Sequence, residues 1–239
     1  MKLLTFQTKE KPGLDRLGIM TPDGQNVLPL EQFGLCFTSM NELIDTITEE
    51  QMEQLKNAAL SPAKEVLPYS SIIKRSPIPV PKQDIICLGI NYAAHAEESA
   101  RYKKEAFERN RQYAVYFSKR VNEAVADGSP IPSHRDLLER LDYEAELAVI
   151  IGKDAEKVSQ EAAFDYVFGY TILNDISARE IQTRHKQWYF GKSMDGFCPM
   201  GPWIVTKEEF QNPPVLSISS RVNKELRQNS STDLLLFSI

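Results

Sequence analysis

The chain has 239 residues and a formal net charge of −5 at pH 7, with 28 Lys and Arg residues against 33 Asp and Glu residues. This length suits one large domain or one domain with a small appendage. The acidic net charge argues against a nucleic-acid partner, because nucleic acids bind to basic protein surfaces. No apolar run approaches the roughly 20 residues that span a bilayer, and the N-terminus becomes charged too soon for a signal peptide. The three cysteines, Cys36, Cys87 and Cys198, form no CxxC pair. We therefore expect a cytoplasmic protein that binds no membrane, with reduced thiols and neither a disulfide framework nor a zinc site.

Alternating apolar and polar residues predict three strands near the N-terminus, over residues 2–6, 14–20 and 26–30. Residues 21–24 have the sequence Thr-Pro-Asp-Gly, which suits a type I turn between the last two strands. A helix should follow, because Ser39 is suited to cap it and an apolar stripe comes next. Helical character continues or restarts over residues 51–55.

Five prolines between residues 61 and 83 indicate an extended connector. We place a domain boundary near Ile78. Residues 1–78 would form a small N-terminal α/β domain with the connector, and residues 79–239 would form the main domain. Most of the main domain predicts strands separated by turns, with helical stretches near residues 94–110 and 178–187.

An acidic segment in the main domain predicts a metal site. Residues 141–153 have the pattern of a strand, on which Asp142, Glu144 and Glu146 project from the same face. Such carboxylates repel one another, and their burial is costly without a compensating positive charge. With no Cys or His among them, the ligands are all oxygens, which favours Mg²⁺, Mn²⁺ or Ca²⁺ over zinc. The alternative is a solvated face of an edge strand.

A histidine and a glutamate predict a general base. If the chain is helical from residue 94, His95 and Glu98 are separated by three residues and meet on one face of the helix. A carboxylate beside an imidazole fixes its tautomer and stabilises its protonated form, which suits a base that acts on water. The alternative is an ordinary pair on the surface of a helix.

Two further clusters carry polar residues suited to a binding site. Asp175 follows an apolar strand, and it is either a third carboxylate ligand or a helix N-cap, with Arg179 and Gln182 facing one pocket beyond it. Lys192 lies among aromatic residues and suits the stabilisation of an oxyanion. A phosphate loop is excluded here, because Gln187 stands where its first glycine is required. The acids could instead be structural ion-pair partners of Lys153 or Arg179.

Together these clusters resemble the fumarylacetoacetate hydrolase family, over about half the chain, from residue 85 to residue 205. The matching motifs, in chain order, are Gly89-Ile-Asn-Tyr-x-x-His95-x-x-Glu98, Phe117-Ser118-Lys119, Asp142-Tyr143-Glu144-x-Glu146-Leu147, Gly169-Tyr-x-x-x-Asn-Asp175-x-Ser-Ala-Arg179-x-x-Gln182 and Gln187-Trp188-x-x-Gly-Lys192-Ser193-x-Asp-x-Phe-x-Pro199-x-Gly-Pro-Trp203.

The resemblance implies an α+β, mainly β fold, in which a mixed β-sandwich roll carries the site and the small N-terminal α/β domain precedes it. It implies a homodimer and a divalent metal, Mg²⁺ first, with Mn²⁺ or Ca²⁺ as alternatives. The residue roles that it implies are Glu144, Glu146 and Asp175 as metal ligands, a catalytic His95–Glu98 dyad on a helix that closes over the substrate, Lys192 as an electrostatic catalyst, and Arg179 and Gln182 as substrate contacts. Asp142 falls outside the family's metal triad.

The resemblance also implies a reaction, and the chain departs from the family pattern in two features. The expected reaction is hydrolysis of a C–C bond in a small 2-oxo acid of the acylpyruvate type, through a metal-bound enolate. Isomerisation, decarboxylation and non-catalytic binding of a metal or 2-oxo acid are the alternatives.

Further strands and a Thr-Gly-Thr-Pro loop are expected beyond residue 239, so we expect an incomplete C-terminal part. The segment over residues 99–113 is longer and more charged than the family pattern leads us to expect.

Overall fold

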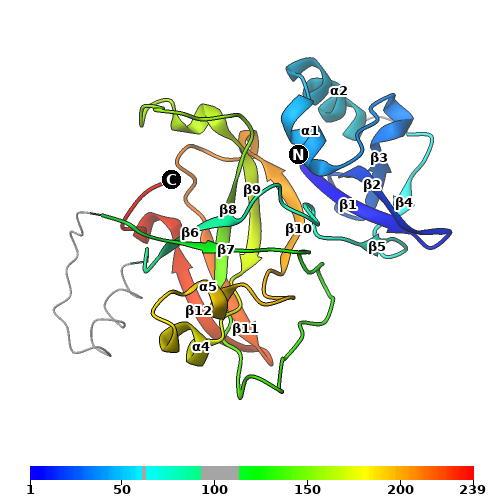
Figure 1. Cartoon of the computed structure of the whole chain (residues 1–239). Helices are drawn as coiled ribbons and strands as arrows, with labels where there is room; N and C mark the ends of the chain where they lie inside the picture. Colours follow the sequence, from blue (N-terminus) through cyan, green and yellow to red (C-terminus); the bar gives the residue numbers. More distant parts are fainter. Residues whose placement is uncertain (61–62, 93–112) are drawn as a thin grey trace.

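The computed structural model describes residues 1–60, 63–92 and 113–239 of the chain. The fold is mainly β, and Figure 1 shows the N-terminal strands with two helices on one side of the molecule and strands β8, β9 and β10 at its centre. The strands are β1 (Lys2–Thr8), β2 (Lys11–Met20), β3 (Asn26–Pro29), β4 (Leu67–Pro68), β5 (Ile73–Lys74), β6 (Ile85–Gly89), β7 (Val115–Lys119), β8 (Ala145–Ile151), β9 (Val167–Asn174), β10 (Met200–Thr206), β11 (Ser217–Val222) and β12 (Glu225–Ser231). The α-helices of the described residues are α1 (Met40–Thr46), α2 (Glu49–Ala59), α4 (Arg179–Arg184) and α5 (Tyr189–Lys192).

One eight-stranded sheet runs through both halves of the chain. Its strand order is β4-β3-β2-β1-β10-β9-β8, and β5 pairs with β1. The two halves meet where β1 pairs with β10, in an antiparallel register that places Lys2 opposite Val205 and Leu3 opposite Ile204. Two further pairs, β6 with β7 and β11 with β12, form separate antiparallel two-stranded sheets. The boundary near Ile78 stays a prediction, but the two units that it separates share this sheet.

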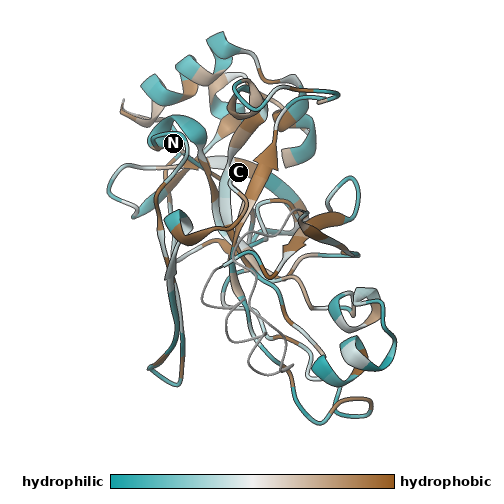
Figure 2. Cartoon of the chain, turned by 90° about the vertical axis from the view of Figure 1, so that its left-hand side faces the viewer, coloured by the Kyte–Doolittle hydropathy of each residue, from teal (hydrophilic) through white to brown (hydrophobic). Residues whose placement is uncertain are grey.

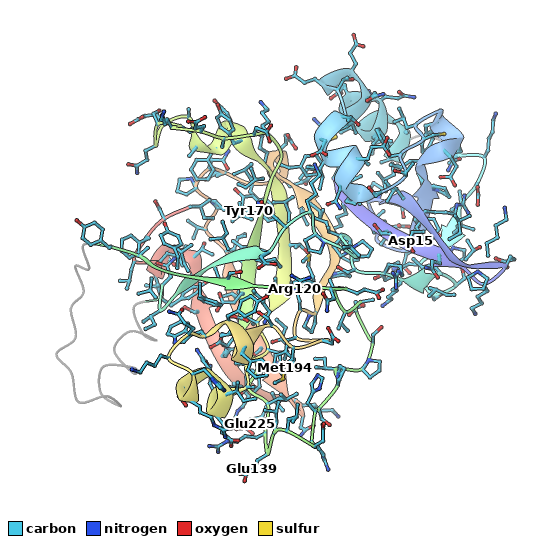
Figure 3. The ribbon with its side chains drawn as sticks, in the orientation of Figure 1. Asp15, Arg120, Glu139, Tyr170, Met194 and Glu225 are labelled. Carbon is cyan, nitrogen blue, oxygen red and sulfur yellow. The ribbon has the colours of Figure 1, made fainter. Side chains whose placement is uncertain are left out.

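The hydrophobic core also crosses the junction of β1 and β10. Leu3 and Ile204 are fully buried in the same cluster as Leu43 of α1 and Leu173 of β9. Figure 2 shows the helical turns at the top of the view largely in teal, as expected for helices that keep one polar face in water. Polar contacts also connect the residues before the predicted boundary near Ile78 with those after it. Arg75 binds both Glu123 and Asp15, which Figure 3 places among the N-terminal strands.

Most local predictions for the N-terminal residues are confirmed. The three predicted strands correspond to β1, β2 and β3, and the Ser39 side chain accepts a hydrogen bond from the backbone N–H of Glu42 at the start of α1. Helix α2 begins after Thr48, which forms a capping box with Gln51. The proline-rich connector is not wholly irregular, because it contributes the short strand β4 at one edge of the main sheet and the short strand β5, which pairs with β1.

Two predictions in the main domain need correction. The acidic strand is shorter than expected, since β8 begins at Ala145, and Asp142 forms only an isolated bridge with Ser177. The helix predicted over residues 178–187 ends at Arg184, and the chain then forms the separate helix α5. The helix predicted over residues 94–110 lies outside the described residues. Of the helices in the described ranges, none is long and apolar enough to cross a membrane.

The shared sheet predicts that Leu3 is important for the stability of the whole chain. Leu3→Ala should lower the free energy of unfolding by about 3 kcal/mol, because it leaves a cavity in the core cluster that Leu3 of β1 shares with Ile204 of β10. Leu14→Ala is the matched control, since Leu14 is 54% exposed on β2, and this change should cost no more than about 0.5 kcal/mol. Urea denaturation of both variants measures the difference, and equal effects would contradict a core that is continuous across the junction.

Candidate functional site

Two predicted ligands lie side by side at neighbouring strand ends. Strands β8 and β9 are antiparallel, and Ala145 is paired with Asn174. Glu144 therefore precedes β8 at the point where Asp175 follows β9. The backbone N–H of Asp175 donates to the carbonyl of Glu144 at 2.8 Å, and the side-chain oxygen of Asn174 accepts from the N–H of Glu144 at 3.0 Å. These bonds fix both carboxylates relative to each other.

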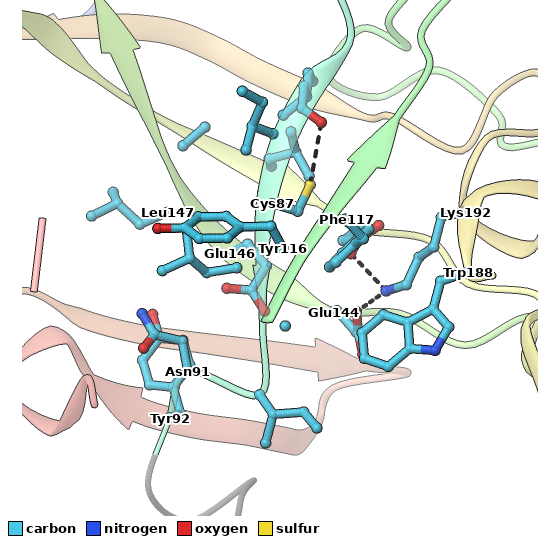
Figure 4. A pocket seen from close by; sticks show the side chains of 18 of the residues that line it. Cys87, Asn91, Tyr92, Tyr116, Phe117, Glu144, Glu146, Leu147, Trp188 and Lys192 are labelled. Carbon is cyan, nitrogen blue, oxygen red and sulfur yellow. Dashed lines mark hydrogen bonds and ion pairs between the residues drawn. The ribbon is translucent and has the colours of Figure 1, made fainter. Parts of the chain in front are cut away.

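The ammonium group of Lys192 bridges these two carboxylates. Its Nζ atom lies 2.5 Å from Oε2 of Glu144 and 2.6 Å from Oδ2 of Asp175. Lys192 is 2% exposed, and its ammonium lies 5.0 Å from the centre of the Phe117 ring. Figure 4 shows the side chain pointing at Glu144 with Phe117 and Trp188 beside it. A buried charge of this kind is stable only when it is paired, and here it is paired twice.

Arg179 adds a second cation to the same group of acids. Its Nε lies 2.7 Å from Oδ2 of Asp142, a second nitrogen of its guanidinium binds Oε1 of Glu144, and a third donates to Oε1 of Gln182 at 3.0 Å. Ion pairing of these acids with Arg179, which the sequence offered as an alternative to metal ligation, is present for Asp142 and Glu144. Because the carbonyl oxygen of Gln182 accepts from Arg179, the amide N–H groups of Gln182 remain as donors for a ligand oxygen.

Glu146 differs from Glu144 and Asp175 because, in the described part of the chain, no ammonium or guanidinium group forms an ion pair with it. It faces the same pocket from β8, and within the described ranges no hydrogen bond or ion pair reaches its carboxyl group. Burial, followed by the charges of Glu144 and Asp175, raises the pKa of Glu146 to about 8. Burial acts on Glu144 in the same direction, but Lys192 and Arg179 outweigh it and hold the pKa of Glu144 below its usual value.

The donor set suits a hard divalent cation. Glu144, Glu146 and Asp175 offer only oxygen atoms, which Mg²⁺ and Mn²⁺ prefer. Burial and then the charges of Glu144 and Asp175 raise the pKa of Glu146, and a bound cation would oppose this rise. Among the described residues, however, no three Asp, Glu, His or Cys side chains are grouped closely enough to hold a metal ion. The chemistry of the three residues fits the metal, and the ligand triad stays a prediction.

The structure places most of the predicted site residues around one pocket. Those that line it are Asp142, Glu144, Glu146, Asp175, Arg179, Gln182 and Lys192. The predicted dyad of His95 and Glu98 lies outside the described residues, so its role stays a prediction. The chain immediately before it, through Tyr92, does line the pocket. Sequence reasoning assigned no role to Lys119, which is fully buried behind Asp175.

The family assignment rests on a match over most of the main domain. The sequence pattern described as fumarylacetoacetate (FAA) hydrolase C-terminal matches residues 84–239. The chain belongs to the fumarylacetoacetate hydrolase family. The mainly β fold expected from the resemblance is confirmed with it.

Two curated members of the family are similar in sequence to this chain. Oxaloacetate tautomerase YisK of Bacillus subtilis (strain 168) is 44% identical over 170 residues, which are 71% of this chain and 55% of that protein. The mitochondrial oxaloacetate tautomerase fahd2 of Xenopus laevis is 36% identical over 241 residues, covering 99% of this chain and 72% of its own length. The chain therefore spans only about half of the Bacillus relative.

A solved family member is similar over nearly the whole chain. The maleylpyruvate hydrolase of Sphingobium sp. SYK-6, solved in complex with manganese(II) and pyruvate, has a TM-score of 0.75 at 27% identity. The match covers 99% of this chain and 78% of the hydrolase. Members of the fumarylacetoacetate hydrolase family with this fold thus include a hydrolase solved with a divalent metal.

Glu146 predicts a specific dependence of stability on pH. The folded chain keeps this carboxyl protonated up to about pH 8, whereas the unfolded chain releases the proton near pH 4. The stability contributed by the neutral form is therefore complete below the unfolded pKa and is lost as the pH rises through the folded pKa.

Glu146→Gln, which cannot ionise, should unfold at a progressively higher temperature than the wild type as the pH rises from about 5 to about 9. Thermal melts followed by circular dichroism, with a chelator present to remove metal, measure this difference. A difference that stays constant over the range would contradict the raised pKa.

Proposed function

We propose that the chain carries the site of an enzyme that interconverts the keto and enol forms of a small 2-oxo dicarboxylate of the oxaloacetate type. The observation that carries the proposal is the buried ammonium of Lys192 in a pocket that also holds Arg179 and Gln182. The names of the two curated relatives support the same reaction.

Each of these residues has a task in tautomerisation. A proton leaves the carbon beside the 2-oxo group, and negative charge develops on the oxygen of that group. The Lys192 ammonium, shielded from water, stabilises this oxyanion more strongly than an exposed lysine would. Arg179 and the free amide N–H groups of Gln182 suit the binding of a substrate carboxylate. The predicted His95–Glu98 dyad would carry the proton.

The proposal includes a divalent cation held by Glu144, Glu146 and Asp175. When bound, such an ion acts as a Lewis acid that polarises the 2-oxo group and orients the substrate. The manganese in the Sphingobium hydrolase supports the use of a divalent metal in the family. Mg²⁺ and Mn²⁺ both suit the three carboxylates.

Hydrolysis of a C–C bond in an acylpyruvate is the second candidate. The Sphingobium maleylpyruvate hydrolase, solved with pyruvate, favours it. This reaction needs an attacking water in addition to the stabilised enolate, so it depends more directly on His95 as a base. Both candidates use Lys192 in the same way, and they differ in whether pyruvate is released.

The proposal predicts that the chain, supplied with Mg²⁺ or Mn²⁺, accelerates the loss of enol absorbance from freshly dissolved enol-oxaloacetate. Lys192→Met should lower kcat about 100-fold, because it removes the charge that stabilises the oxyanion. Lys153→Met is the matched control, since Lys153 is exposed after β8 and should be replaceable without loss.

A coupled assay for pyruvate, run in parallel with an acylpyruvate substrate, separates the two candidates. Enol decay without pyruvate release supports the tautomerase, and pyruvate release supports the hydrolase. If the wild type accelerates neither reaction, or if Lys192→Met is as active as Lys153→Met, the proposed function is wrong.

A further inference from the structure

Lys119 is a buried lysine behind the candidate site. It ends strand β7, is 0% exposed and does not line the pocket. An ammonium group removed from water costs several kcal/mol unless its charge and its N–H groups find partners. A structural or functional role must therefore compensate for the burial of Lys119, and the contacts of its ammonium group indicate that role.

Within the described ranges, the polar contacts of this ammonium are all with segments that carry candidate site residues. Its Nζ forms an ion pair with Oδ1 of Asp175 at 2.7 Å. It donates to the carbonyl of Ile176 at 3.1 Å and to the carbonyl of Lys192. The Phe197 ring, itself buried, lies 5.8 Å from the ammonium. Asp175 and Lys192 line the pocket but Lys119 itself does not, so Lys119 acts on the site through these residues.

These contacts close a ring of three residues. Lys119 holds the backbone of Lys192, the side chain of Lys192 returns to Oδ2 of Asp175, and Oδ1 of Asp175 faces Lys119. The ring connects β7, the end of β9 and helix α5, which are far apart in the chain. Asp175 is held between two ammonium groups, one on each oxygen, so rotation of its carboxylate would break an ion pair.

We propose that Lys119 is a positioning residue for the reaction, which fixes the Asp175 carboxylate and the Lys192 side chain in their working arrangement. The proposal rests on the proposed function for the roles of Asp175 and Lys192. Displacing a catalytic group by about 1 Å can cost about 100-fold in rate, so a buried lysine that holds two such groups has a large effect without touching the substrate.

The test compares Lys119→Met with Lys207→Met. Methionine keeps much of the length of lysine but removes its charge. Lys207 is the matched control, because its Nζ also donates to two backbone carbonyls, those of Phe164 and Asp165, at 3.0 and 3.2 Å. It lies in a short 3₁₀ helix after β10 and does not line the pocket.

Two readouts are measured at a temperature at which circular dichroism shows all proteins folded. The first is the acetylation rate of Lys192 by an N-hydroxysuccinimide ester, followed by peptide mass spectrometry. Lys119→Met should raise this rate at least about 10-fold, because Lys192 loses its backbone anchor and its fixed partner. The second is the tautomerisation of oxaloacetate, in which kcat should fall about 100-fold with little change in KM. Lys207→Met should change neither readout.

Each possible result either supports or overturns the proposed positioning role of Lys119. A folded Lys119→Met with wild-type Lys192 acetylation and wild-type kcat overturns it. If the wild type shows no turnover, the proposed function fails, but the acetylation rates still test the positioning. If Lys119→Met does not fold, Lys119→Gln replaces it, since glutamine keeps N–H donors for the carbonyls and removes only the charge. Failure of both to fold, while Lys207→Met folds, assigns Lys119 to stability alone and overturns the proposal.

Discussion

The arrangement of the site depends on the ion pairs that Lys192 makes with Glu144 and Asp175. Two carboxylates that are held side by side in a buried position repel each other, and a cation between them converts this repulsion into attraction. Arg179 and Lys119 complete the compensation from two other directions. The three cations then balance the acids that they touch, while Glu146 remains as a half-buried carboxyl group whose pKa is raised. Such a cluster is costly to assemble and is typical of functional sites.

The fold supplies the rigidity that this cluster requires. Asp175 stands at the end of β9, which lies between β8 and β10 in the sheet, and β10 in turn pairs with the N-terminal strand β1. The core on one face of this sheet extends from α1 to β9. The N-terminal residues therefore support the strand that carries a candidate ligand, although they line no part of the pocket. Packing across this sheet therefore limits movement of the strand end that precedes Asp175.

The local sequence pattern predicted the strands and helices better than it predicted the contacts between them. The strands near the N-terminus and the cap at Ser39 follow from alternation and short-range chemistry, and the structure confirms them. The meeting of Glu144 with Asp175 depends on the register of β8 against β9, which no spacing in the sequence determines; the family resemblance supplied that pairing. The burial of Lys119 could not be predicted, because a lysine at a strand end is usually exposed, and only the packing of β7 against α5 encloses it.

The most direct test of the central claim is a calorimetric titration of oxalate, a planar mimic of a 2-oxo acid enolate, into the chain with and without Mn²⁺. The account predicts binding that requires Mn²⁺ and that weakens at least about 10-fold in Glu146→Ala, because each removed carboxylate weakens the cation site. Binding of equal strength with and without Mn²⁺, or unchanged binding in Glu146→Ala, would contradict the assignment of these carboxylates to a metal-assisted enolate site.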